Sequence, residues 1–526
     1  MSATAPAPRE RRRSTLARFR NPVLPGFHPD PSICRVGTDY YLVTSTFEYF
    51  PGLPLYHSRD LVHWRQLGHV LDRPDQLPLA GVRSSNGLFA PTIRYHDGRF
   101  YVICTLVGGH DRAGTFVVTA ADPTGPWSDP YWLPEAEGID PSLFFDNGRA
   151  WCVGCRPLTE PDYPGQTEIW LREFDPIGMR LVGAEQVIWR SALGGAVWTE
   201  APHLYKVDGR YYLLTAEGGT GHDHAVMIAR ADQITGPYQG SPRNPVLTHR
   251  HLGRDHPIVG TGHGDLVCTP GGQWWMVLLG MRPYGGYFYN LGRETFLVPV
   301  RWAEGWPVAS EGTGRVEDSY PAPDLPEHRW PAEPATDNFE APTLAPLWNV
   351  LRTPDKQFWS LEAVEMCIRD SLDTPSFVGR RQQHIDFAAR TAVDFQPESE
   401  HESAGLALVQ SDAFHLTLTV TGRRQRVVRL ARRYQRSTEV LAEAPVAEGR
   451  VYLGVEARGQ NYQMRFATRP DRWKPLGEPV DGRLLSTPVA GGFVGTYLGV
   501  YATSDGQPSS NHADFDWFEY LALDAG

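Results

Sequence analysis

The sequence has few cysteines and no long apolar run, and both shortages narrow the class of protein. Six cysteines are scattered over 526 residues, so the chain lacks the dense disulfide framework of a small secreted domain. No stretch approaches the roughly 18 apolar residues of a membrane-spanning helix. The basic leader, residues 1–20, has no apolar core of the kind found in signal peptides. We therefore expect a cytoplasmic protein that does not contact membranes.

Positive charge is also in short supply. The chain has 50 lysines and arginines against 61 acidic residues, a net charge of −11. This balance argues against nucleic acid as a partner and favours a neutral substrate. Cys152 and Cys155 form a CxxC pair, but no second pair completes a zinc site, so we interpret them as buried thiols.

Aromatic residues and turn-forming residues are abundant, and they recur periodically. A turn followed by paired aromatics and an aliphatic run occurs five times, around Tyr41, Tyr101, Trp151, Tyr212 and Trp275. The copies are 60, 50, 61 and 63 residues apart. Each copy has the pattern of a hairpin that enters a buried strand. Five such units predict an all-β fold that begins with a five-bladed β-propeller.

A second motif precedes each aromatic pair by 11 to 14 residues, as HPDPSI, FAPTIRY, IDPSLFF, EAPHLYK and HGDLV. Equivalent strands of a propeller surround its central channel, so residues in equivalent register should meet at one end of that channel. The residues in this register are Asp30, Phe89 or Ala90, Asp140, Glu200 and His263.

Three convergent carboxylates suggest cleavage of a glycosidic bond. That reaction needs a protonated carboxylic acid and an ionised partner, and a third carboxylate would raise the pKa of the acid. Pro29 and Pro31 flank Asp30, and we expect them to hold its backbone stiff and extended. Taken singly, Asp30 also fits a structural turn and His263 a structural histidine. A calcium site is a weaker alternative, because the spacing does not resemble an EF-hand.

The second half of the chain predicts a different β domain. Five prolines in YPAPDLPEHRWPAEP indicate a stiff linker, and alternating strands beyond it indicate a β-sandwich of jelly-roll or concanavalin-like type. The stretch VEMCIRDS, residues 364–371, breaks the alternation without a structural explanation. The expected organisation is a flexible leader at 1–20, a propeller at 21–320, a linker at 321–335 and a sandwich at 336–526.

The motifs together resemble glycoside hydrolase family 43, the β-xylosidase and α-L-arabinofuranosidase group. The resemblance runs from residue 21 to residue 520 and includes NPVLPGFHPDPSI, GLFAPTIRY, GIDPSLFFD, TEAPHLYK, TGHGDLV and LGRETFLVPVRW. It implies a five-bladed propeller and a C-terminal β-sandwich that helps to close the pocket.

The resemblance also implies roles for individual residues. Asp30 would be the general base that activates water, Glu200 the general acid, and Asp140 the third carboxylate that raises the pKa of the acid and orients it. The other implied substrate-binding residues are Phe47, Phe89, Ala90, Thr220, His263, Arg293 and, from the sandwich, Tyr497. For Tyr497, a place in the hydrophobic core is an almost equal alternative.

The expected activity is an inverting, exo-acting release of terminal xylose, and also arabinose, from xylo-oligosaccharides or arabinoxylo-oligosaccharides. Inversion predicts catalytic carboxyls about 6.5–9.5 Å apart. An α-L-arabinofuranosidase is the main alternative, since Phe89 and Thr92 stand where many family β-xylosidases have tryptophan and aspartate. A non-catalytic carbohydrate-binding propeller is a remoter one. No cofactor is required, but the resemblance allows a structural Ca²⁺ in the channel near His263. The sequence leaves the oligomeric state open, a homo-oligomer included.

Overall fold

The computed structural model describes residues 17–354, 357–362, 365–368 and 376–523. The predicted leader up to residue 16, and parts of the irregular stretch at 364–371, lie outside these residues. The fold is all-β, as predicted, and the described helices are short: η1 (Ser310–Gly312), η2 (Gly482–Leu485) and α1 (Thr487–Ala490). Within the described ranges, no helix has the length and apolar character needed to cross a membrane.

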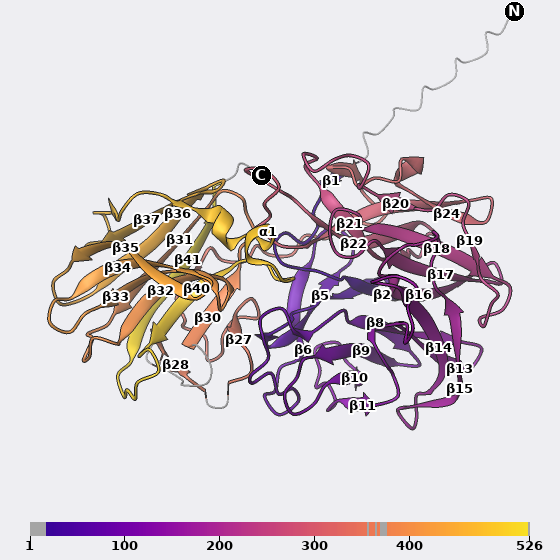
Figure 1. Ribbon diagram of the computed structural model, residues 1–526, viewed down its shortest axis with the longest axis horizontal. Helices are drawn as coiled ribbons and strands as arrows, with labels where there is room; N and C mark the ends of the chain where they lie inside the picture. Colours follow the sequence, from indigo (N-terminus) through magenta and orange to yellow (C-terminus); the bar gives the residue numbers. More distant parts are fainter. Residues whose placement is uncertain (1–16, 355–356, 363–364, 369–375, 524–526) are drawn as a thin grey trace, which may run out of the picture.

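The N-terminal domain is a propeller of five antiparallel sheets, which occupies the right half of Figure 1. Each aromatic pair of the sequence repeat lies in the strand that pairs with the innermost strand of its blade. The first three blades comprise β2 (Ser32–Val36), β3 (Asp39–Val43), β5 (Gly52–Ser58) and β6 (Arg65–Leu71); β7 (Gly87–Leu88), β8 (Thr92–His96), β9 (Arg99–Val107), β10 (Gly114–Ala120) and β11 (Tyr131–Leu133); and β12 (Ile139–Asp146), β13 (Arg149–Pro157), β14 (Thr167–Asp175) and β15 (Arg180–Trp189). The last two comprise β16 (Glu200–Val207), β17 (Arg210–Glu217), β18 (Ala225–Ala231), β19 (Gln239–Gly240) and β20 (Leu247–Thr248); and β21 (Val259–Cys268), β22 (Trp274–Met281), β23 (Glu294–Ala303) and β24 (Trp306–Ala309).

The innermost strands form a closed ring around the channel. β2, β8, β12, β16 and β21 contact one another in this order, and β21 contacts β2 again. Apolar side chains fill the space between blades; Ile103 and Val117 of the second blade share a buried cluster with Leu143 of the third. Cys152 and Cys155 are buried free thiols within the third blade, as predicted.

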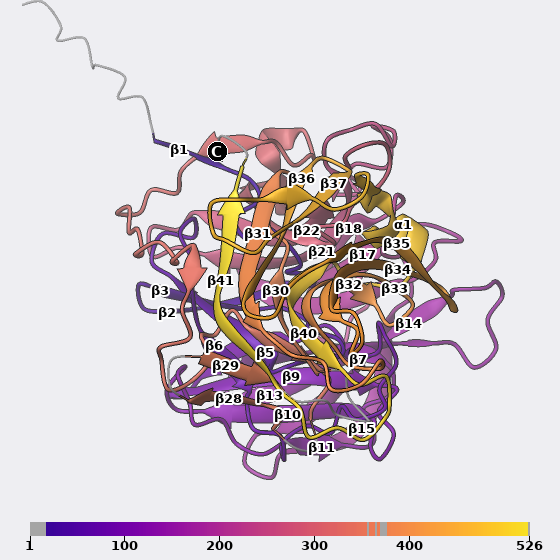
Figure 2. The same cartoon turned by 90° about the vertical axis from the view of Figure 1, so that its left-hand side faces the viewer.

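The C-terminal domain is a sandwich of two antiparallel sheets, which faces the viewer in Figure 2. Leucine and valine side chains from both sheets pack between them, among them Leu406 and Leu418 from one sheet and Leu453 and Val455 from the other. One sheet has the order β35 (Ser437–Pro445), β34 (Val427–Tyr434), β33 (Phe414–Thr421), β32 (Ser403–Ser411), β40 (Tyr497–Thr503), β30 (Ser376–Arg381), β27 (Asn349–Leu351) and β4 (Tyr49–Phe50). The other contains β28 (Trp359–Glu362), β29 (Glu365–Ile368), β41 (Ala513–Ala522), β31 (Phe387–Asp394), β36 (Val451–Arg458), β37 (Asn461–Ala467) and β38 (Lys474–Pro475), with β26 (Thr336–Asp337) and β39 (Val480–Asp481) beside it.

Two strand pairings tie distant parts of the chain together. Strand β4 leaves the first blade and pairs with β27, so a propeller segment forms the edge of a sandwich sheet. Strand β1 (Arg18–Arg20) pairs with β25 (Ser319–Pro321). Residues 18–20, which the sequence analysis assigned to the flexible leader, are therefore a strand, because the ladder with β25 satisfies their backbone groups.

Candidate active site

A cavity of about 360 Å³ opens at one end of the propeller channel, beside a loop of the sandwich. The structure brings nine of the ten predicted site residues together in its wall: Asp30, Phe47, Phe89, Ala90, Asp140, Glu200, Thr220, His263 and Arg293. They come from all five blades, as the register of the repeat predicts. Four further residues complete the wall: Ile139, Trp198, Gly219 and Phe493.

Irregular backbone aims the polar residues into the cavity. Asp30, Asp140 and His263 have φ values of 53°, 54° and 51°, in the left-handed region that non-glycine residues seldom occupy. The strand register shifts at Asp140 and at His263, as it does just after Glu200. Such bulges re-aim side chains next to active sites. The expectation of an extended backbone at Asp30 is therefore wrong: the need to direct its carboxylate into the channel overrides the preference that Pro31 imposes.

The carboxylate of Asp30 is held by two donors and lies near a third. Arg293 Nη1 donates to its Oδ1 at 2.5 Å, and the Ser45 hydroxyl donates to its Oδ2 at 2.6 Å. His263 Nδ1 lies 3.7 Å from Oδ1. The Asp30 side chain is buried, so a charge there needs the compensation that the guanidinium provides. Its orientation is fixed, as the activation of one water molecule requires.

Glu200 and Asp140 are the other two carboxyl groups of the cavity wall. Burial raises the pKa of Glu200 well above its ordinary value, and the negative charges of Asp140 and Asp30 raise it further. Burial likewise raises the pKa of Asp140, while His263 lowers it. Asp140 Oδ2 accepts the backbone N–H of Ala201 at 3.0 Å, which connects it to the residue after Glu200. The environment thus favours a protonated Glu200.

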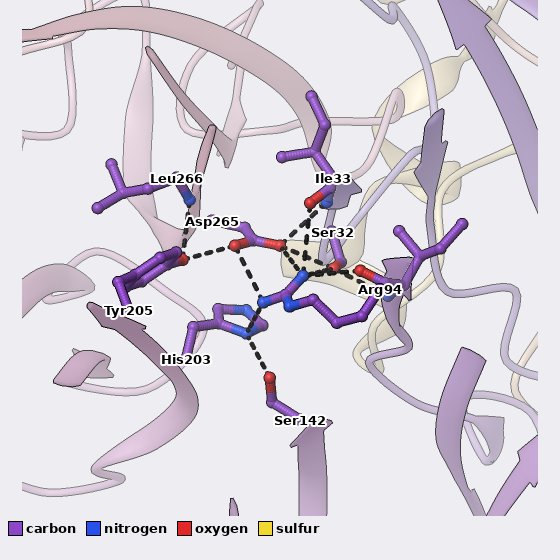
Figure 3. A network of polar contacts seen from close by, with 9 residues as sticks. Ser32, Ile33, Arg94, Ser142, His203, Tyr205, Asp265 and Leu266 are labelled. Carbon is purple, nitrogen blue, oxygen red and sulfur yellow. Dashed lines mark hydrogen bonds and ion pairs between the residues drawn. The ribbon is translucent and has the colours of Figure 1, made fainter. Parts of the chain in front are cut away.

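A network of polar side chains joins the innermost strands of the propeller (Figure 3). Its centre is the buried carboxylate of Asp265, which accepts hydrogen bonds from two nitrogens of Arg94, at 2.8 and 3.2 Å. Burial by itself would raise the pKa of Asp265, but the Arg94 guanidinium holds it well below its ordinary value. Ser32 and Tyr205 donate to the same carboxylate at 2.7 and 2.5 Å.

The same network reaches the remaining blades through His203. Arg94 Nη2 donates to Nδ1 of His203 at 3.0 Å, which makes Nδ1 an acceptor, and the Ser142 hydroxyl lies 3.0 Å from the same atom. Burial lowers the pKa of His203 to about 3, so this imidazole is neutral. Side chains from all five blades therefore meet in one layer, which lies behind the residues that line the cavity.

The carboxylate in this polar layer is not free to bind calcium. Calcium takes six to eight oxygen ligands, whereas Asp265 is already committed to Arg94, Ser32 and Tyr205. Among the residues that the structure describes, no group of three or more His, Cys, Asp or Glu side chains could hold a metal ion. A Ca²⁺ near His263 stays a prediction of the resemblance, and no step proposed below depends on it.

Aromatic side chains form the apolar wall. The rings of Phe47 and Phe89 lie 5.0 Å apart, and Phe493 of the sandwich stacks on Phe47 at 5.9 Å. The Phe493 backbone N–H donates to Ser85 Oγ at 2.9 Å, which fixes the sandwich loop to the propeller. Sequence reasoning missed Phe493, although it lies four residues before Tyr497 in the stretch GGFVGTYLGV. Trp198, also missed, lies two residues before Glu200.

Tyr497, the tenth predicted residue, does not line the cavity. It is completely buried, and its ring stacks on that of Tyr49 with 3.8 Å between the centroids. The guanidinium carbon of Arg381 lies 5.4 Å from the centroid of the Tyr497 ring. The reason is strand geometry: Tyr497 begins β40 in the middle of a sheet, whereas Phe493 lies in the loop before that strand and is free to point toward the propeller.

Comparisons with known proteins agree with this architecture. Residues 19–307 match the model of glycosyl hydrolases family 43, and residues 336–521 match the β-xylosidase C-terminal concanavalin A-like domain. The chain is 43% identical to a non-reducing end α-L-arabinofuranosidase of Bacteroides ovatus, over 96% of this chain and 95% of that protein. It is 42% identical to a xylosidase/arabinosidase of Butyrivibrio fibrisolvens, over 95% and 98% of the two chains. The crystal structure of a xylan β-1,4-xylosidase from Bacillus halodurans superposes with a TM-score of 0.90 at 38% identity, over 95% and 99%. The chain belongs to glycosyl hydrolase family 43.

Proposed function

We propose that this hydrolase removes a terminal xylose or arabinose from the non-reducing end of xylo-oligosaccharides or arabinoxylo-oligosaccharides, with inversion of configuration. The observation that carries the proposal is the set of three carboxylates in one cavity, in which the environment of Glu200 favours its protonated form. A carbohydrate-binding protein without activity would not need a carboxyl group whose pKa is raised in this way.

In the proposed reaction, Asp30 takes a proton from a water molecule that attacks the anomeric carbon. Glu200 gives its proton to the glycosidic oxygen, so that the sugar leaves as an alcohol and not as an alkoxide. Asp140 raises the pKa of Glu200 by charge repulsion and helps to position it through the backbone of Ala201. Arg293 holds Asp30 in place and lies where it can also donate to hydroxyl groups of the sugar.

Exo action is supported by the shape of the site. The cavity of about 360 Å³ is near the lower end of the volumes of small-molecule sites, which suits the end of a substrate better than a long stretch of it. The aromatic wall of Phe47, Phe89 and Phe493, to which both domains contribute, covers one side of it.

The choice between the two pentoses stays open, and the names of the relatives include both. We propose that xylose and arabinose are both accepted, since no charged group other than the carboxylates, His263 and Arg293 lines the cavity within the described residues.

The deciding measurement compares hydrolysis of an aryl β-D-xylopyranoside with that of an aryl α-L-arabinofuranoside by the purified protein. The anomeric configuration of the released sugar is followed by NMR. The proposal predicts turnover of at least one substrate with an inverted product. A retained product, or no turnover of either substrate, would contradict it.

A further inference from the structure

Trp198 is the aromatic side chain at the rim of the cavity that the proposed reaction does not use. It lines the cavity, yet 45% of it is exposed, whereas Phe47 in the same wall is only 2% exposed. Aromatic side chains that line a pocket commonly contact its ligand, and a ring that is also partly exposed can stack on a part of the ligand that extends from the pocket. Within the described part of the chain the indole N–H has no hydrogen-bond partner, so both the ring and its donor are available to a ligand.

The backbone holds Trp198 in an unusual conformation. Its φ of 53° is in the left-handed region, which bulky residues seldom occupy. Its backbone N–H donates to the carbonyl of Gly165 at 2.7 Å. Strain of this kind persists only where the surrounding structure imposes it, and it concentrates at functional sites.

Two glycines make room for the indole. A Cβ atom at Gly219 would lie 2.9 Å from Cδ1 of Trp198, and one at Gly165 would lie 3.2 Å from its Cε2. Any side chain at either position would therefore push the ring from its place. The two close approaches come from different blades, so the ring is seated between the third and fourth blades.

The segment that carries Trp198 is anchored at several points. The carboxyl of Glu217 accepts the backbone N–H of Ala192, the Gly218 N–H donates to the carbonyl of Val197 at 2.8 Å, and the Tyr163 hydroxyl donates to the carbonyl of Ala196 at 2.8 Å. An exposed ring on a firmly held segment loses little conformational freedom when a ligand covers it.

The position of Trp198 in the sequence indicates what covers it. Glu200 lies two residues further on, and the acid must contact the oxygen that joins the terminal sugar to the leaving group. The leaving group therefore emerges on the side of Glu200, where Trp198 lines the rim. We propose that Trp198 is a platform on which the first sugar ring of the leaving group stacks, so that it selects oligosaccharide leaving groups. This inference rests on the proposed function.

The test compares substrates that differ only in the leaving group. Wild type, Trp198→Ala and Trp198→Phe are assayed with xylobiose and with β-D-xylopyranosyl fluoride, whose leaving group has no ring, or with the corresponding arabinofuranosides if those are preferred. For Trp198→Ala we expect kcat/KM on the disaccharide to fall about tenfold or more, with the fluoride changed less than about twofold. Trp198→Phe should recover most of the loss. Tyr131→Ala, which removes an equally exposed aromatic ring from β11, should change neither rate.

Two outcomes would overturn the inference: equal losses on both substrates, or an unchanged rate on the disaccharide. A binding measurement keeps the test independent of turnover. Calorimetric affinity for xylotriose is compared between Glu200→Gln and the double variant with Trp198→Ala, and a loss of about tenfold is expected. If wild type hydrolyses neither pentoside, the proposed function is wrong. If the double variant binds xylotriose as tightly as Glu200→Gln does, the proposed platform is wrong. It is also wrong if Glu200→Gln does not bind xylotriose.

Discussion

The buried carboxyl of Glu48 should make the stability of the protein depend on pH. Glu48 follows Phe47 of the cavity wall and has no exposed surface. Its Oε2 accepts the backbone N–H of Ser85 at 3.0 Å, and within the described residues Oε1 has no partner. Burial raises the pKa of this carboxyl from 4.5 to about 8. Its backbone carbonyl accepts the N–H of Arg352 at 2.8 Å, so the residue lies where propeller and sandwich meet.

The magnitude follows from the difference between the two pKa values. Because the folded-state pKa is the higher one, the folded chain keeps a proton that the unfolded chain loses between pH 4.5 and 8. The free energy of unfolding therefore falls as the pH rises through this window, by about 1.4 kcal/mol per pH unit. The full contribution of Glu48 is present below pH 4.5, and about 5 kcal/mol of it has been lost above pH 8. Between pH 5.5 and 9 the expected loss from this group is about 3 kcal/mol.

Glu48→Gln should remove this contribution, since the amide is neutral at every pH and resembles the protonated acid in shape. The assay is urea denaturation of wild type and variant at pH 5.5 and pH 9. Other buried carboxyls titrate in both proteins and cancel in the comparison. Glu443→Gln, which removes an exposed carboxylate on β35, should retain the wild-type pH dependence. If Glu48→Gln loses as much stability between the two pH values as wild type does, Glu48 is not the source.

Three further variants test the site. Glu200→Ala should lower kcat on substrates with poor leaving groups about 10²- to 10⁴-fold. In wild type, kcat should fall as the pH rises through the raised pKa of Glu200. If the variant keeps the same fall of kcat at alkaline pH, Glu200 is not the acid. Asp30→Asn should abolish turnover while the circular dichroism spectrum stays that of wild type, and an active variant would exclude Asp30 as the base. Arg94→Met leaves Asp265 as an uncompensated buried charge, so the free energy of unfolding should fall by about 3–5 kcal/mol, measured by denaturation; the double variant with Asp265→Asn should recover part of this loss.

The arrangement of the site could be predicted because the propeller repeats its register along the chain. Asp30, Asp140 and Glu200 are far apart in sequence, but each precedes the aromatic position of its own blade by 11 or 12 residues. Counting from those positions is enough to place the three carboxylates in one ring, since strand length fixes the distance along the channel. No local preference of any of these residues carries that information.

The backbone at these positions could not be predicted from local rules. A residue before proline favours extended conformations, yet Asp30 and Asp140 both precede proline and have positive φ. The conformation of Asp30 is held by a contact between neighbouring blades, the bond from Arg293 to Asp30, which joins the fifth and first blades. Interactions between residues some 260 positions apart leave no trace in a short window of sequence.

The contribution of the sandwich shows a related limit. The stretch GGFVGTYLGV carries the correct signal, but alternation does not reveal where the loop ends and β40 begins. That boundary depends on the pairing of Tyr497 with Arg381 and Val409, and on the stacking of Tyr497 against Tyr49 of β4. Because β4 belongs to the propeller, the two domains determine the boundary together, and Phe493 becomes the residue that reaches the cavity.

The repeat also contributes residues to a second layer of polar side chains, the network around Asp265. In three blades the residue two positions after the channel-facing group joins this layer, although the register shifts of β12 and β21 interrupt simple alternation there. Ser32 follows Asp30 in this way, Ser142 follows Asp140, and Asp265 follows His263, and all three join the network of Figure 3. The second blade supplies no carboxylate to the upper layer but provides Arg94 to the lower one. The Arg94 guanidinium thus connects the innermost strands of the first, fourth and fifth blades through Ser32, His203 and Asp265. The strands of the first and fourth blades begin beside Asp30 and at Glu200, so the network ties together segments between which the repulsion that raises the pKa of Glu200 acts.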